Sequence, residues 1–378
     1  MGGTRSVVRP PCINVTSLGQ TSSRHADSFG VYIHIPFCHK KCDYCAFATW
    51  ADKQSLVTDY MTALRTDIER VVRTGMATVD TVFVGGGTPT IVDPDALAAC
   101  IELLPLAAGA EITVECNPDD VTLELMQRYA HAGVNRISMG VQSMRTSVLA
   151  SLGRTHNVEH VQVAVAAVRD AGIEGLNLDL IYGAHGETLD DWSRTLREAV
   201  ELSPTHISAY ALTVEAGTPL ALDAARHPDD DDLADKYIVA DDILTEAGLE
   251  NYEISNWALP GFECRHNIIY WTQGNYLGVG CAAHSHDNGR RWWNVRTPER
   301  YIQAVTRDEP TEAAGETLDI ATRKRERLEL MLRMRDGIEA HHLPIKDLQG
   351  LVTVRNGRAC LTQQGRLLAN GVSLKIIP

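Results

Sequence analysis

The chain has 378 residues, of which 44% are hydrophobic, and its 49 acidic and 35 basic side chains give a formal charge of −14. This length favours two or three domains with a sizeable core. The negative charge disfavours a nucleic-acid partner, because an acidic surface repels phosphate backbones. No apolar run approaches the roughly 18 residues that a transmembrane helix needs.

The first residues, 1–29, are rich in Gly, Ser, Thr and Arg. They lack the apolar segment of a secretory signal, so we predict a flexible leader on a cytoplasmic protein. The chain contains nine cysteines. Because no export signal is present, we do not expect disulfides.

The apolar run Val31–Ile35 leads directly into a cysteine-rich loop with the spacing C-x3-C-x2-C. The three cysteines are Cys38, Cys42 and Cys45. Thiolates are the usual ligands of iron–sulfur clusters, and three of them leave one iron of a cubane open to another ligand. Zinc is the alternative, with His34 or His39 as its fourth ligand. The loop alone favours the cluster.

Six short apolar segments recur, each before a polar or glycine-rich turn: Val31–Ile35, Thr81–Val84, Glu111–Glu115, Arg136–Gln142, Gly175–Tyr182 and Thr205–Thr213. Stretches with helical spacing of apolar residues lie between them: Leu56–Val72, Leu123–Ala130, Val158–Ala171 and Trp192–Leu202. Glycines stand where helix ends are expected: Gly75, Gly133, Gly172 and Gly248. This alternation predicts parallel βα units.

Polar residues gather where the predicted strands end: Cys38, Gly85–Thr88, Glu115, Asn117, Gln142, Asp179 and Tyr210. In βα barrels the site is built from several strand ends at one face. Six units cannot close an eight-stranded barrel, so we predict an α/β fold with a partial (βα)6 barrel over residues 30–255. Periodicity alone also allows a doubly wound sheet.

The pattern changes after Ile254. Residues 256–297 are aromatic and are expected to be a loop region. Residues 298–378 are expected to form a C-terminal mixed α/β, winged-helix-like domain, with a helix over Arg323–Met334 and a strand–turn–strand unit around Asn356 and Gly357.

A glycine-rich turn, Gly85–Pro89, follows the second predicted strand. Glycines let a ligand approach the backbone closely, but the sequence lacks the Gly-Lys-Ser/Thr of a phosphate loop. By itself the motif indicates a tight turn as readily as a binding loop.

Together, the cysteine loop and GGGTP resemble the radical S-adenosylmethionine superfamily. The segments YIHIPFC, GGGTPT, ECNP, SMGVQS, LGRTH and NLDLIYG resemble its oxygen-independent coproporphyrinogen oxidase group, and more narrowly the heme chaperone HemW branch. The likeness runs from about Tyr32 through Gly280 and continues more weakly to the C-terminus. It implies a [4Fe–4S] cluster whose open iron binds S-adenosylmethionine.

The resemblance assigns roles by position. The cluster ligands would be Cys38, Cys42 and Cys45. Residues expected to contact S-adenosylmethionine are Tyr32, Tyr44, Gly86, Gly87, Thr88, Glu115, Gln142, Arg154 and Asp179. Tyr44 is expected beside the adenine, and the Gly86–Thr88 segment at the methionine end. For Arg154 and Asp179 a structural ion pair is the alternative, because ion-pair networks also gather in clefts.

Two departures from the group bear on function. Coproporphyrinogen oxidases carry a further cysteine where this chain has Phe47, and they have a longer segment before the cluster loop. Both favour a heme chaperone over an enzyme of porphyrin biosynthesis. An oxygen-independent coproporphyrinogen III dehydrogenase, which decarboxylates propionates by radical chemistry, is the alternative.

A segment reading HNIIYW, His266–Trp271, resembles one associated with heme in HemW proteins. Imidazole is a standard axial ligand of heme iron, so His266 is the candidate ligand. Its rivals are Cys264, His284 and His286. The partners that the resemblance implies are heme, acceptor apo-hemoproteins (membrane-associated ones included), a protein that reduces the cluster, and a second copy in a homodimer.

Overall fold

The computed structural model describes residues 28–378. The predicted leader at 1–29 therefore lies outside the described residues, apart from its last two positions. Within residues 28–378, no helix combines the length and the apolar character that crossing a membrane requires.

The core of the molecule is a parallel sheet that contains all six predicted strands. They are β1 (Phe29–Ile35), β2 (Val79–Gly86), β3 (Leu106–Cys116), β4 (Arg136–Gln142), β5 (Gly175–Tyr182) and β6 (His206–Ala211). Each is hydrogen-bonded to the next in parallel. The sheet does not close on itself, so the predicted α/β fold with a partial barrel is confirmed.

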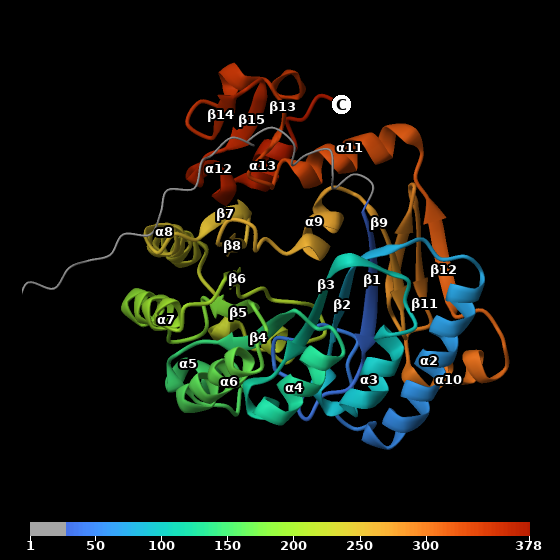
Figure 1. Ribbon diagram of the computed structural model, residues 1–378. Coiled ribbons are helices and arrows are strands. Elements are labelled where there is room, and N and C mark those ends of the chain that lie inside the picture. Colours follow the sequence, from blue (N-terminus) through green and yellow to red (C-terminus); the bar gives the residue numbers. More distant parts are fainter. Residues whose placement is uncertain (1–27) are drawn as a thin grey trace, which may run out of the picture.

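Helices cover the outer face of this curved sheet (Figure 1). They are α2 (Val57–Arg73), α3 (Pro94–Ile101), α4 (Leu123–His131), α5 (Thr146–Ser151), α6 (Val158–Asp170), α7 (Leu189–Glu201) and α8 (Asp230–Glu246). Local sequence sets their ends. Thr188 forms a capping box with Asp191 at the start of α7. Gly75, Gly133, Gly172 and Gly248 all have positive φ at the predicted helix ends.

The prediction of a loop region over 256–297 is wrong. This part of the chain holds β8 (Asn256–Ala258), α9 (Arg265–Trp271), β9 (Asn275–Val279), β10 (His284–Asp287) and β11 (Arg290–Asn294). Strand β9 pairs in parallel with β1 as a seventh parallel strand. These segments are too short to show a clear alternating pattern, and the long sheet supplies the pairing that stabilises them.

The sheet has twelve strands in the order β12-β11-β10-β9-β1-β2-β3-β4-β5-β6-β8-β7, with β7 at Glu250–Glu253 and β12 at Glu312–Thr317. Helix α10 (Pro298–Thr306) also belongs to this body, because Tyr301 donates a 2.7 Å hydrogen bond to Asp67 of α2. Residues 298–317 therefore pack with the main sheet rather than with the C-terminal unit.

The C-terminal unit has its own hydrophobic core, which includes Leu332, Ile338 and Val372. It comprises α11 (Ile320–Met331), β13 (Ile338–Glu339), β14 (Val352–Arg355), β15 (Arg358–Leu361), α12 (Gln363–Leu367) and α13 (Ala369–Ser373). Asn356 and Gly357 both have positive φ, as a two-residue hairpin turn of type I′ requires. Figure 1 shows this unit beside α8 and α9, and Gln363 donates to Asp241 of α8 across 2.9 Å.

Candidate functional site

A cavity of about 480 Å³ opens at the carboxyl ends of the parallel strands and contains the cysteine loop. Of the predicted site residues, those that line it are Cys38, Cys42, Cys45, Tyr44, Gly86, Gly87, Thr88, Glu115, Gln142, Arg154 and Asp179. They come from the carboxyl ends of β1 to β5 and from the loops that follow, with Arg154 in the loop between α5 and α6. The tertiary structure therefore brings together segments that are up to 141 residues apart in sequence, as Cys38 and Asp179 are.

The cysteine loop is held at its base by backbone hydrogen bonds between residues 36–38 and Trp50. The Cys38 N–H donates to the Trp50 carbonyl over 3.0 Å, and the Trp50 N–H donates to Pro36 over 2.8 Å. All three thiols are free. Burial raises the pKa of Cys38 and of Cys45, so a metal or cluster must displace protons from them on binding.

The histidines considered as a fourth zinc ligand have other partners. The His34 ring is buried, with Nδ1 3.0 Å from the Tyr32 hydroxyl and Nε2 3.0 Å from the Ala48 carbonyl. His39 is exposed and lies 3.3 Å from Asp120. A zinc site at this loop would have to break one of these contacts, which favours the cluster.

The glycine-rich turn is packed directly against the cysteine loop. The Gly87 N–H donates to the Ile35 carbonyl over 2.8 Å, and the Thr88 N–H donates to Phe37 over 2.7 Å. A Cβ at Gly87 would lie only 2.3 Å from the Phe37 carbonyl oxygen. Gly86 has φ of 113°, and a Cβ there would lie 2.4 Å from the His34 ring. A side chain at either position would collide with the cysteine-loop segment, so both positions require glycine.

Arg154 connects the cysteine loop to two strand ends. Its Nη1 donates to the Cys42 sulfur over 3.7 Å, and its Nη2 donates to Asn117 Oδ1 over 2.7 Å and to the Gly140 carbonyl over 3.0 Å. Because these partners are a thiol, an amide and a carbonyl, Arg154 makes no ion pair with Asp179. The structural ion pair considered for these two residues is absent among the described contacts.

Two carboxyl groups, Glu115 and Asp179, lie in the wall of the cavity. Burial, with the nearby Asp179 as the smaller cause, raises the pKa of Glu115 to about 8, although Gly86 donates to it. Burial also raises the pKa of Asp179, although Ser138 and Asn177 donate to it over 2.8 and 2.9 Å. A cationic ligand group such as an ammonium would lower both pKa values, because it stabilises the charged carboxylates.

Tyr44 and Gln142 reach the cavity in different ways. Tyr44 packs against an apolar cluster that includes Ile181 and Leu212, a surface suited to a flat ring. Gln142 has φ of 64°, where a bulge shifts the pairing of β4 with β5 between Gly140 and Gln142. Bulges of this kind re-aim a side chain near a site.

A second, smaller cavity of about 150 Å³ lies beside the first, and Tyr32 and His266 line it. The two cavities share a wall formed by Glu115, Ser138, Asp179 and Tyr210. Tyr32 therefore lies behind the predicted cofactor cavity and does not line it.

His266 is enclosed in the protein. Its Nδ1 lies 2.8 Å from the Thr81 hydroxyl and its Nε2 lies 2.8 Å from the Tyr270 hydroxyl, so both ring nitrogens are engaged. Burial lowers the pKa of His266 to about 3, so the ring is neutral. In this arrangement a heme iron could bind His266 only if one of these hydrogen bonds broke.

The rival heme ligands differ in accessibility. Cys264 is buried and lies 3.6 Å from Glu111 Oε1. His286 is buried and its Nδ1 lies 2.8 Å from the Gly274 carbonyl. His284 is exposed and stacks on Trp293 with ring centroids 5.7 Å apart, and its imidazole makes no hydrogen bond to any described residue.

A polar network between the cavities was not predicted from sequence. Asn177 Nδ2 donates to Ser138 over 2.7 Å and to Ser208 over 3.0 Å, and Asn177 Oδ1 accepts from His206 Nδ1 over 2.6 Å. These residues occupy inward positions of β4, β5 and β6. Polar residues at alternate positions of otherwise apolar predicted strands were the signal that could have found them.

Comparison with known proteins defines the class. The model of the radical SAM superfamily matches residues 32–199. This chain is also similar to the solved structure of coproporphyrinogen III oxidase (HemN) from Escherichia coli, a radical SAM enzyme. The superposition covers 93% of this chain and 90% of the HemN chain, with a TM-score of 0.80 and 23% sequence identity. The fold is therefore that of an α/β radical SAM protein with a C-terminal mixed region.

Sequence relatives define the family more narrowly. The chain is 38% identical over 364 residues to the heme chaperone HemW of Mycobacterium tuberculosis, covering 91% of this chain and 93% of the relative. It is 39% identical over 284 residues to HemW of Escherichia coli, covering 72% of this chain and 75% of that one. The chain belongs to the HemW family of the radical SAM superfamily.

Proposed function

We propose that this chain is a heme chaperone that binds heme and delivers it to acceptor hemoproteins. The observation that carries the proposal is the 38% identity to a HemW protein across 93% of that relative's length. The likeness includes both the parallel-sheet body and the C-terminal unit. The proposed partners are heme, acceptor apo-hemoproteins and a protein that reduces the cluster.

The proposal includes a [4Fe–4S] cluster on Cys38, Cys42 and Cys45 and S-adenosylmethionine in the 480 Å³ cavity. When bound, such a cluster supplies a low-potential electron and an open iron for the amino and carboxylate groups of S-adenosylmethionine. The neighbouring groups support this placement. Arg154 contacts Cys42 and orients the loop, and Glu115 and Asp179 offer carboxylates to an ammonium or to ribose hydroxyls.

The residue at position 47 favours a chaperone over an enzyme. Phe47, where coproporphyrinogen oxidases have a cysteine, has 68% of its surface exposed at the mouth of the cavity. A coproporphyrinogen III dehydrogenase is the alternative function, because the fold of that enzyme is closely similar.

One assay separates the two functions. The protein with its cluster assembled is incubated anaerobically with coproporphyrinogen III, S-adenosylmethionine and a reductant. We expect no more product than one turnover per cluster. Protoporphyrinogen formed over many turnovers would establish the enzyme instead.

A second assay tests heme binding and locates the ligand. The anaerobic protein is titrated with heme, with and without its cluster, and compared with His266→Ala and His284→Ala variants. We expect saturable one-to-one binding that at least one substitution weakens by about tenfold or more, as for loss of an axial ligand. If only His284→Ala loses heme affinity, the exposed imidazole of His284 is the axial ligand. If only His266→Ala loses it, α9 must move to expose His266 to heme. Absence of saturable binding by the unaltered protein would overturn the chaperone proposal.

A further inference from the structure

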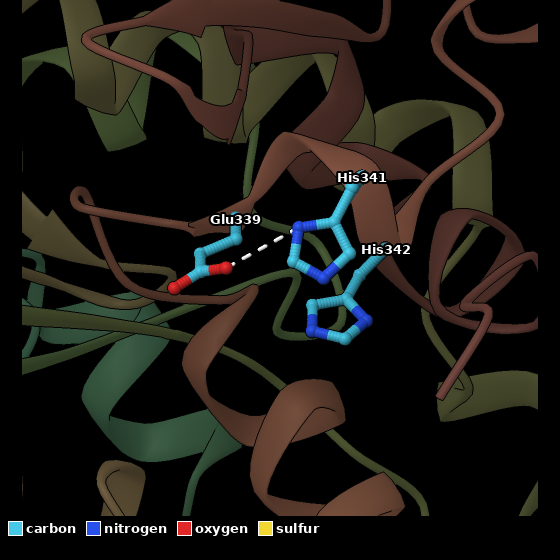
Figure 2. Close-up of side chains that lie close together, drawn as sticks. All are labelled: Glu339, His341 and His342. Atoms are coloured by element: carbon cyan, nitrogen blue, oxygen red, sulfur yellow. Dashed lines mark ion pairs between the residues drawn. The ribbon is translucent and has the colours of Figure 1, made fainter.

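A group of two histidines and one glutamate lies in the C-terminal unit, away from both cavities. Glu339 ends β13, and His341 and His342 lie in the single 3-10 turn Ala340–His342 that follows. One potential ligand atom from each residue lies within 4.8 Å of the other two. Figure 2 shows the three side chains converging, with His341 facing Glu339.

One of these ligands is held in place. His342 is buried, and its Nδ1 lies 2.7 Å from the Ile377 carbonyl. A carbonyl accepts only, so Nδ1 carries the proton and donates, which leaves the lone pair on Nε2. The Ile377 N–H donates in turn to the His342 carbonyl over 2.9 Å. Metal-binding histidines usually donate their other ring nitrogen to a carbonyl or carboxylate in this way.

The other two ligands can adjust to an ion. The Glu339 and His341 side chains are 64% and 67% exposed, and His341 Nδ1 lies 3.2 Å from Glu339 Oε2. Zinc bonds of about 2.0–2.1 Å place neighbouring tetrahedral ligands about 3.3 Å apart. That pair is already spaced as zinc requires. The imidazole rings of His341 and His342 lie with centroids 4.0 Å apart, and one potential ligand atom of each residue lies within 4.8 Å of the other two. The exposed Glu339 and His341 side chains would therefore have to move toward the buried His342 imidazole for all three to bind one ion.

We propose that Glu339, His341 and His342 bind one Zn²⁺ ion. Two imidazoles and a carboxylate are a ligand set that zinc favours, and three protein ligands leave a fourth position open to water or to a ligand from another molecule. The bound ion cross-links the turn after β13 to the segment at Ile377 through His342. The site does not depend on the proposed heme function, because it lies in the C-terminal unit, which has its own hydrophobic core.

The test is calorimetric titration of Zn²⁺ into the protein with its [4Fe–4S] cluster assembled, so that the cysteine loop is occupied. The unaltered protein is expected to bind one equivalent. His341→Ala and Glu339→Gln should each weaken this binding by about tenfold or more, the effect of losing one zinc ligand. The matched control is His131→Ala, an exposed histidine at the end of α4, which should bind zinc unchanged.

Two further measurements place the ion. Co²⁺ at this site should give only weak visible bands, because no thiolate is a ligand. Zinc should also slow hydrogen exchange at the Ile377 amide, and this protection should be lost in His341→Ala, which leaves the His342–Ile377 contacts intact. Equal zinc binding by the unaltered protein and His341→Ala, or thiolate-to-cobalt bands that Cys42→Ala removes, would overturn the proposal.

Discussion

The two cavities of the barrel share a wall, yet the polar groups that line them differ in how they are hydrogen-bonded. The larger one is lined by four free thiols, which include the three of the cysteine loop, and by two carboxyl groups whose pKa values burial raises. In the smaller one the polar groups satisfy one another, as His266 does with Thr81 and Tyr270. The thiols of the cysteine loop are available to a ligand, whereas mutually bonded groups such as His266 stabilise the fold.

This difference divides residues that the sequence motifs alike predicted to bind a ligand. Tyr32 and His266 stand in motifs as distinctive as those of the cysteines, but they belong to the satisfied cavity. Substitutions in each cavity should therefore have different effects on cofactor binding and on stability.

The largest effect is expected at the cysteine loop. Cys42→Ala should lose nearly all cluster iron and the broad visible absorption of a [4Fe–4S] centre, because two thiolates hold a cubane poorly. Iron analysis and absorption after anaerobic reconstitution measure this. The control is Cys360→Ala, a thiol buried in β15 that should leave the iron content unchanged. A full cluster in Cys42→Ala would contradict the site.

The next effect is expected at the glycine turn. Gly87→Ala places a Cβ 2.3 Å from the Phe37 carbonyl oxygen, and backbone cannot move aside as a flexible side chain can. We expect a loss of about 3 kcal/mol in the free energy of unfolding, measured with urea, together with weaker S-adenosylmethionine binding.

The matched control for this change is Gly371→Ala in α13, where a Cβ meets nothing within 4 Å. It should stabilise the protein by about 0.5–1 kcal/mol, because alanine favours helix. Equal effects of the two substitutions would contradict the close approach of the two loops.

A substitution in the smaller cavity should lower the stability of the protein and leave S-adenosylmethionine binding unchanged. His266→Ala leaves the Thr81 and Tyr270 hydroxyls without their partner, so we expect unfolding to become easier by about 2 kcal/mol. S-adenosylmethionine affinity should stay within about twofold of the unaltered protein, a change under about 0.5 kcal/mol. His185→Ala, at an exposed position, is the control. A large loss of cofactor affinity in His266→Ala would remove the distinction between the cavities.

The last effect is a dependence of stability on pH, expected from Glu115 in the shared wall. The pKa of Glu115 rises from 4.5 to about 8 on folding, so the native state keeps a proton that the unfolded chain releases. Its contribution to stability is complete below pH 4.5 and is lost as pH rises to about 8. In cluster-free protein, Glu115→Gln should therefore flatten the fall of stability across this window.

Urea unfolding at a series of pH values measures this dependence. The exposed Glu124→Gln variant serves as the control and should keep the slope. An unchanged slope in Glu115→Gln would show that Glu115 is ionised in the native protein.

Much of the fold could be predicted because its signals are local. The bounds of β4 and β5 match the predicted segments, and Asn356-Gly357 marks a hairpin turn through residues that tolerate positive φ. The strands β9 to β11 could not be predicted, because their pairing depends on distant neighbours such as β1.

The sequence by itself determined the cysteine spacing, the βα alternation and the motifs that define the family, since each depends on residues close together in the chain. Only the tertiary structure decided which of those residues share a cavity. Cys42 and Arg154 meet because parallel strands bring their carboxyl ends to one edge. His266 is enclosed because α9 packs near the amino ends of the same strands. There the hydroxyl groups of Thr81 and Tyr270 hydrogen-bond to both of its ring nitrogens.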